Sequence, residues 1–92
     1  MKAITLFLAC VALAALTALA ADIELKPVKS SLLDKVGYDP GTRVLAIQMV
    51  NSSDVYTYQD VPAAIYEGLL AADSKGAYYV ENIKGRFETK RQ

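Results

Sequence analysis

Beyond residue 29, apolar and polar side chains alternate in three short stretches, the spacing expected of strands with one buried face. The clearest stretch has Leu45, Ile47 and Met49 at every second position. The stretches before and after it carry β-branched and aromatic residues, which favour strands. Three strands are therefore predicted, over Ser30–Tyr38, Arg43–Val50 and Val55–Gln59.

The segments around these predicted strands are polar. Asp39–Thr42 contains Pro40 and Gly41; proline presets φ at the first central position of a tight turn and glycine tolerates a positive φ at the second. Asn51–Asp54 is a polar four-residue loop. Asp22–Lys29 is a short lead-in that we expect to be extended.

A helical period replaces the alternation after residue 60. Pro62 suits the first turn of a helix because its missing N–H is not needed there. The apolar residues that follow fall on one stripe and its margin: Ile65, Leu69 and Ala72, with Tyr66 and Leu70 beside them. A helix over Pro62–Ala72 is predicted.

A second, shorter helix is predicted after an interruption at Asp73-Ser74, which can cap it. It runs through Tyr78, Tyr79 and Val80 to Ile83, and Gly85 is its expected terminator. Phe87 is expected to pack back on the body of the protein. Glu88–Gln92 is predicted to be a frayed tail.

The predicted element order is strand, strand, strand, helix, helix. This is an α+β domain: a three-stranded antiparallel meander followed by two helices packed on one face (β-β-β-α-α). A single domain over residues 21–92 accommodates all of these elements, close to the size at which one core is marginal.

The direction of the central tyrosines follows from the predicted hairpin. If Asn51–Asp54 is a simple loop, Met49 lies opposite Tyr56 and Ile47 opposite Tyr58. Cross-strand partners share a face. Both rings are then walls of the core with hydroxyls reaching its rim, rather than platforms for stacked bases. A one-residue bulge would reverse this prediction.

Short motifs recur in a fixed order along these elements. They are Ser30-Ser31, Val36-Gly37-Tyr38-Asp39, Leu45-x-Ile47-x-Met49, Tyr56-x-Tyr58, Val61-Pro62-x-x-Ile65-Tyr66-x-x-Leu69, Ser74-x-Gly76-x-Tyr78-Tyr79 and Asn82-Ile83. The series resembles the KTSC domain, a small module named after the C-terminal extension of some lysyl-tRNA synthetases. The resemblance covers about Val28 to Phe87. It implies an uncharacterised function, for which RNA binding has been suggested from the synthetase association.

The N-terminus has the layout of a secretory signal peptide. Lys2 is followed by a stretch without charge from Ala3 to Ala21, and small residues, Ala18 and Ala20, occupy the −3 and −1 positions of a cleavage site. We expect cleavage after Ala20, so that residues 1–20 are the signal peptide and the product is secreted or periplasmic.

A membrane anchor and a lipoprotein acylation site are two other roles for the leader. An uncleaved stretch of this length could anchor the protein as a membrane helix, although its many alanines make it weakly hydrophobic. Acylation at Cys10 would make a lipoprotein, but the apolar run continues well beyond that residue. Cleavage is favoured over both.

Composition excludes most familiar catalysis. The whole chain is 53% hydrophobic, a figure raised by the leader, and it has no histidine and a single cysteine, Cys10, within that leader. Triads, thiol nucleophiles and zinc sites are therefore not expected. Asp54 and Asp60 are read as turn or cap residues rather than a catalytic pair. We predict no enzyme activity, no catalytic residue, no metal and no cofactor.

Net charge bears on the choice between the two remaining function classes, RNA binding and binding of a protein or envelope component. Without Lys2 the chain has nine basic and ten acidic residues, whereas nucleic-acid binders usually carry a positive excess. A basic cluster near the C-terminus, beside Tyr78 and Tyr79, keeps RNA binding as the alternative. The favoured hypothesis is an exported, non-catalytic binding module whose partner is an unknown protein or envelope component; a membrane role requires an uncleaved leader.

The candidate binding surface consists of tyrosines and nearby basic residues, because Tyr and Arg are enriched at interfaces. Its members are Tyr56, Tyr58, Tyr66, Tyr78, Tyr79, Lys84 and Arg86. Packing of the helix face against the sheet is at least as good an explanation for Tyr66, Tyr78, Tyr79 and Arg86. The interior of the domain is favoured for Tyr56 and Tyr58, and a solvated helix face and tail is favoured for the basic cluster that includes Lys84 and Arg86.

Overall fold

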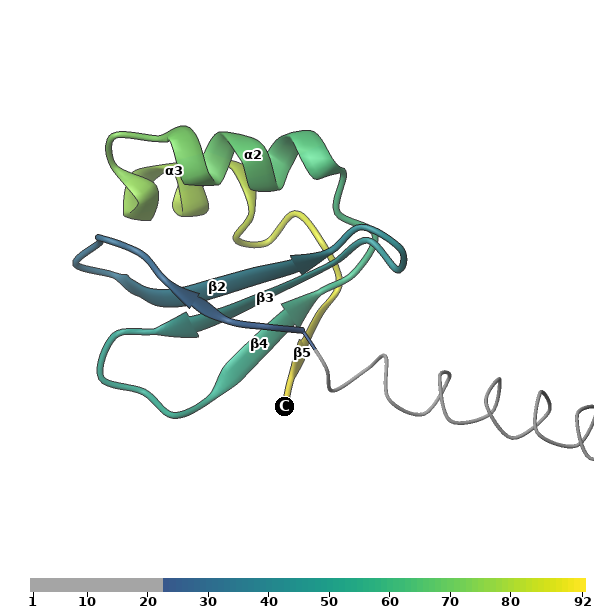
Figure 1. Cartoon of the computed structure of the whole chain (residues 1–92), viewed down its shortest axis with the longest axis horizontal. Coiled ribbons are helices and arrows are strands. Elements are labelled where there is room, and N and C mark those ends of the chain that lie inside the picture. The colour runs from purple at the N-terminus through teal and green to yellow at the C-terminus, as the bar shows by residue number, and fades with distance from the viewer. Residues whose placement is uncertain (1–22) are drawn as a thin grey trace, which may run out of the picture.

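A five-stranded antiparallel sheet, in the order β1-β2-β3-β4-β5, carries two helices on one face (Figure 1). The computed structural model describes residues 23–92, so the predicted signal peptide and its cleavage site lie outside the described residues. The elements are β1 (Lys26–Pro27), β2 (Leu33–Asp39), β3 (Val44–Met49), β4 (Val55–Tyr58), α2 (Ala63–Ala71), α3 (Lys75–Asn82) and β5 (Thr89–Arg91).

The α+β class and the order of the central elements are confirmed, but the number of strands predicted was too small. The lead-in supplies β1, which pairs with β2. The prediction of a frayed tail was wrong, since Thr89–Arg91 pairs with β4 as β5. Both added strands are short and exposed on every residue, so neither shows the hydrophobic alternation that marks the central strands.

The register between β3 and β4 differs from the predicted one by two residues. Tyr58 pairs with Leu45 and Tyr56 with Ile47, because the hairpin closes at the pair of Gln48 with Val55. The loop is therefore longer than the four residues predicted. A shift of two residues keeps every side chain on its face, and both tyrosines lie on the helix-covered face, as predicted.

The turn between β2 and β3 places its positive φ at an unexpected residue. Arg43, not Gly41, has the left-handed conformation, with φ of 60°. The Arg43 N–H donates to the Asp39 carbonyl at 2.7 Å, while the Asp39 carboxylate accepts from the Gly41 N–H at 2.9 Å. The turn is thus one residue longer than the Asp39–Thr42 prediction.

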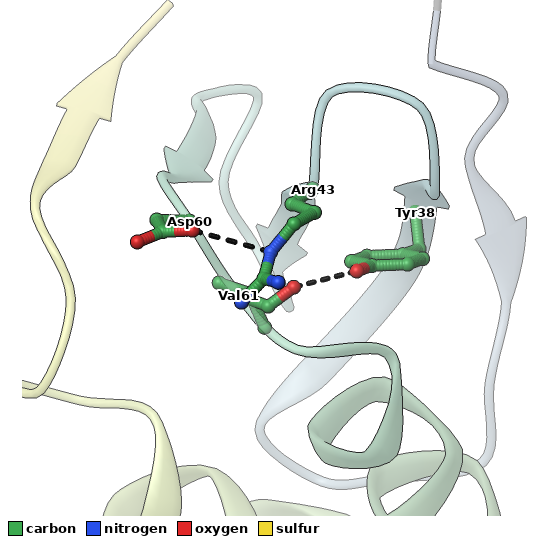
Figure 2. Close-up of polar contacts among 4 residues, drawn as sticks. All are labelled: Tyr38, Arg43, Asp60 and Val61. Carbon is green, nitrogen blue, oxygen red and sulfur yellow. Dashed lines mark hydrogen bonds and ion pairs between the residues drawn. The ribbon is translucent and has the colours of Figure 1, made fainter.

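The segment from β4 to α2 is tied to this turn. The Val61 N–H donates to the Arg43 carbonyl at 2.8 Å, and the Tyr38 hydroxyl donates to the Val61 carbonyl at 2.5 Å. Arg43 also pairs with Asp60 at 3.1 Å on the surface (Figure 2). These contacts fix where the chain leaves the sheet and therefore where α2 begins.

The predicted helix boundaries agree closely with the structure. α2 follows Pro62 directly, and α3 is capped by the Ser74 hydroxyl, which accepts from the Ala77 N–H at 3.3 Å. Gly85 has φ of 74° just after α3, where the chain turns back towards the sheet. Phe87 packs against the core, as predicted.

The core lies between the helices and the covered face of the sheet. Its members come from both layers and are buried: Leu33, Val36, Leu45, Ile47, Tyr58, Val61, Leu69, Tyr79 and Ile83. α2 contributes one of its two adjacent leucines to this core. Leu69 has no exposed surface, whereas Leu70 is 44% exposed.

Truncation of these two leucines should have very different effects. Leu69→Ala removes a fully buried side chain, so we expect a loss of about 2–5 kcal/mol in the free energy of unfolding. Leu70→Ala is the matched control in the same helix, with an expected change below about 0.5 kcal/mol. Urea denaturation followed by circular dichroism measures both; equal losses would contradict the assigned packing of α2.

Candidate functional site

A groove of about 440 Å³ lies beside α3, over β4 and β5. It is lined by the residue before β2, by residues of β3, β4, α3 and β5, and by the turn after α3, and we refer to it as the groove. Its lining residues are Leu32, Met49, Tyr56, Tyr58, Tyr79, Val80, Lys84, Gly85 and Thr89. It gathers aromatic side chains from both layers, and we take it as the candidate site.

Two buried tyrosines join the sheet to α3 beneath the groove. Tyr58 is 3% exposed and Tyr79 is 7% exposed. Their rings meet edge to face, with centroids 6.1 Å apart and an interplanar angle of 79°, and their hydroxyl oxygens are 2.7 Å apart in a hydrogen bond. Each hydroxyl therefore has its partner inside the protein.

The electrostatics of this pair favour the neutral state. Burial raises the pKa of the Tyr58 hydroxyl well above its ordinary value, and the hydrogen bond to Tyr79 raises it further. A neutral hydroxyl already engaged with its neighbour is poorly suited to act as a nucleophile or a base. The two tyrosines thus form a rigid, uncharged floor beneath the groove.

The rim of the groove is largely apolar. Leu32 is 38% exposed and Val80 is 53% exposed, while Met49 and Tyr56 are half-buried beside them. Lys84 is the one charged residue in the lining. This combination offers an apolar surface with a single positive charge at its edge.

The structure brings four of the seven predicted surface residues together in the groove: Tyr56, Tyr58, Tyr79 and Lys84. The other three contact the domain itself. Tyr66 stacks on Tyr38 with ring centroids 5.1 Å apart, and burial raises its pKa.

Tyr78 and Arg86 complete the set of three. The Tyr78 ring lies so close to Gly68 that a side-chain carbon there would collide with it, so Tyr78 packs α3 against α2. The Arg86 guanidinium donates to the Glu81 carbonyl at 2.9 Å near the end of α3. Neither lines the groove.

Sequence patterns did not identify the aliphatic part of the groove. Leu32, Met49 and Val80 come from three separate elements, and each was assigned only to a strand or a helix. Thr89 was placed in the tail. One signal in the sequence could have indicated this part of the groove. Val80 on α3 is apolar, but it does not share the helical spacing that places Tyr79 and Ile83 in the core.

The two aspartates considered for catalysis lie in separate ion pairs. Asp60 pairs with Arg43 at 3.1 Å and Asp54 with Arg91 at 3.8 Å. Within residues 23–92, no three His, Cys, Asp or Glu side chains gather to hold a metal ion. In the same part of the chain, no helix is both long and apolar enough to cross a membrane.

Comparisons with known proteins identify the module. The family model of the KTSC domain matches residues 29–87, which confirms the resemblance over nearly the predicted span. The crystal structure of a KTSC domain protein from Yersinia pestis superimposes with a TM-score of 0.73 and 34% identity, covering 77% of this chain and 99% of that one.

Relatives in sequence include a stand-alone protein and part of an enzyme. A protein of Tsukamurella paurometabola is 36% identical over 63 residues, which cover 68% of this chain and 92% of that protein. A lysine–tRNA ligase of a Nostoc species is 38% identical over 64 residues, covering 70% of this chain but only 11% of the ligase.

Removing the two buried hydroxyls should have non-additive effects on the free energy of unfolding. Tyr58→Phe or Tyr79→Phe leaves the partner hydroxyl buried without its bond, and each should lower the free energy of unfolding by about 1–3 kcal/mol. The double variant replaces the polar pair by an apolar one and should cost less than the sum. Urea denaturation of all four proteins measures the coupling; strict additivity would contradict the contact.

The raised pKa of Tyr58 predicts a loss of stability at alkaline pH. A group that holds its proton more tightly in the folded state contributes fully to the stability of the fold below its unfolded pKa, which is about 10 for tyrosine. That contribution is lost as the pH rises further. The free energy of unfolding should therefore fall from about pH 9 to about pH 11 more steeply in the wild type than in Tyr58→Phe. Parallel pH profiles of the two proteins would overturn the assignment.

Proposed function

The chain belongs to the KTSC domain family, and from that premise we propose that it is a small, non-catalytic binding module that holds an apolar group of a partner in the groove. The observation that carries this proposal is the pair of exposed aliphatic side chains on the rim, Leu32 and Val80, set around the buried tyrosines. An apolar group placed there removes its own surface and that of the rim from water.

The size of the groove suits a side chain or a small ring system. About 440 Å³ lies within the range of sites that enclose small ligands. Burial of an aliphatic side chain of valine or leucine size contributes about 1.5–3 kcal/mol, so one such group gives weak binding and a tight complex needs further contacts. Lys84 adds a preference for a partner with negative charge nearby.

RNA binding is the second candidate function, and the match to a lysine–tRNA ligase favours it. Base stacking requires an accessible ring face. Tyr58 and Tyr79 are buried and engaged with each other, which leaves Tyr56 as the one half-exposed ring of the lining. The aliphatic rim and the single lysine therefore suit an apolar group better than a polynucleotide.

The location of the module is part of the proposal. The leader supports export, with cleavage after Ala20 and a secreted or periplasmic product, and with an anchored form as the alternative. The partner is then a protein or envelope component outside the cytoplasm.

The mass of the intact protein isolated from its producing cells tests the export proposal. We expect the mass of a chain that begins at Ala21, recovered from the periplasm or the medium. A chain that begins at Met1 in the soluble cytoplasmic fraction would contradict export and would strengthen the RNA alternative.

Matched substitutions on the two helices test the groove. The probe is 1-anilinonaphthalene-8-sulfonate, which is aromatic and anionic and fluoresces when it leaves water. Val80→Gln at the rim should weaken probe binding about five- to tenfold, since it removes aliphatic surface. Leu70→Gln, a comparably exposed leucine on α2 away from the lining, should leave it unchanged.

A twelve-nucleotide oligouridine at two salt concentrations provides the competing test. The proposal predicts no displacement of the fluorescent probe by this oligonucleotide. Oligouridine binding that falls steeply with salt and requires Lys84 and Arg86 would instead establish the RNA alternative.

A further inference from the structure

Among the described residues, two residues of β5 direct their backbone N–H and C=O groups away from the sheet. The Gln59 N–H donates to the Glu88 carbonyl at 2.9 Å, and the Gln92 N–H donates to the Val55 carbonyl at 2.7 Å. Antiparallel pairs alternate between residues that exchange backbone hydrogen bonds and residues whose groups point away. The N–H and C=O groups of Thr89 and Arg91 therefore point out of the sheet.

The opposite edge of the sheet is less able to pair. β1 comprises two residues, and the Val28 N–H donates to the Asp34 carbonyl at 3.0 Å. The same alternation turns Pro27 outward, and proline has no N–H to donate. Of the two sheet edges in the described chain, the one formed by β5 can therefore accept another strand more readily.

The side chains of β5 connect this open edge to the groove. Thr89 pairs with Tyr58 and Arg91 with Tyr56, and partners across an antiparallel ladder share a face. Thr89 also lines the groove. A strand added at about 4.8 Å from β5 would thus project every second side chain over the face that contains the groove.

The charges at this edge select the partner. Lys84 lines the groove, Lys90 and Arg91 lie within β5, and Glu88 and Asp54 are the acidic residues nearby in sequence or contact. The balance is positive, which favours an acidic segment. It disfavours a second copy of this chain, because two β5 strands would bring their basic side chains together.

From these observations, and resting on the groove as the proposed binding site, we infer that the partner is an extended acidic peptide segment that pairs with β5 as a sixth strand. Alternate apolar side chains of the segment enter the groove beside Val80, on the face that also carries Lys84 and Arg91. The intervening acidic residues project from the opposite face, where Lys90 is the basic residue of β5. Main-chain hydrogen bonds to Thr89 and Arg91 supply affinity, and the groove selects the side chain. A nucleic acid offers no alternating N–H and C=O groups to this edge.

The test uses the protein as purified from its producing cells and an acetylated seven-residue peptide that alternates glutamate with leucine. Binding is followed by fluorescence anisotropy of a labelled peptide, and amide hydrogen exchange is followed by NMR. We expect the amides of Thr89 and Arg91 to become protected, while the amide of Lys90, which faces β4, changes little. Methylation of the alternate peptide nitrogens that face β5 should weaken binding at least about tenfold.

Substitutions in the protein separate the groove from the edge. Val80→Gln and Lys90→Glu should both weaken peptide binding, and Leu70→Gln should not. A peptide of the same composition with its leucines adjacent rather than alternating should bind much more weakly. Far-ultraviolet circular dichroism establishes that each variant is folded before its affinity is measured.

Each remaining outcome contradicts the inference in a recognisable way. Binding that depends on Val80 but tolerates peptide methylation, with unchanged exchange at Thr89 and Arg91, overturns strand pairing and leaves the groove as a binding site. Absence of any peptide or dye binding rejects both. Protection of Thr89 that grows with protein concentration alone assigns the edge to a second copy, and tighter salt-dependent binding of oligouridine assigns it to RNA.

Discussion

The contact between Tyr58 and Tyr79 is the interaction on which the rest of the candidate site depends. It joins β4 to α3 through an edge-to-face ring contact and a hydrogen bond between the two hydroxyls. Both groups are buried, so the arrangement is stable only while each satisfies the other. Both rings belong to the core between helix and sheet, and both line the groove.

The central Tyr-x-Tyr of this KTSC domain therefore contains two residues with different roles. Tyr58 is committed to the interior by its contact with α3, whereas Tyr56, two residues earlier on the same face, reaches the rim of the groove. Sequence matches to a protein of similar length and to a small part of a ligase show that this domain occurs in two settings. The fold alone therefore does not define a function, which must be argued from the residues of the site.

The two ends of the described part of the chain form the edges of the sheet. The segment before β1 passes so close to Gly37 that a side-chain carbon at Gly37 would collide with the Glu24 carbonyl. The short β1 then pairs with β2, and its Pro27 limits the pairing of a further strand with this edge. The C-terminal segment instead ends the sheet with a fully exposed strand of polar and basic residues. One edge is thus closed by its composition and the other is left with outward backbone groups beside the groove.

The sequence by itself determined the class of the fold, the central hairpin strands, both helices and the face on which Tyr56 and Tyr58 lie, because periodicity and capping residues act locally. It could not place β1 or β5, since residues such as Thr89 and Lys90 become a strand only because β4 presents unpaired backbone groups to them. The sequence also left five tyrosines together as candidates for the binding surface, without separating those that pack the domain from those that border a groove. Only the tertiary structure separated Tyr66 and Tyr78, which pack the helices, from Tyr56, which borders the groove, because burial and the meeting of Leu32, Met49 and Val80 arise from contacts between elements distant in the chain.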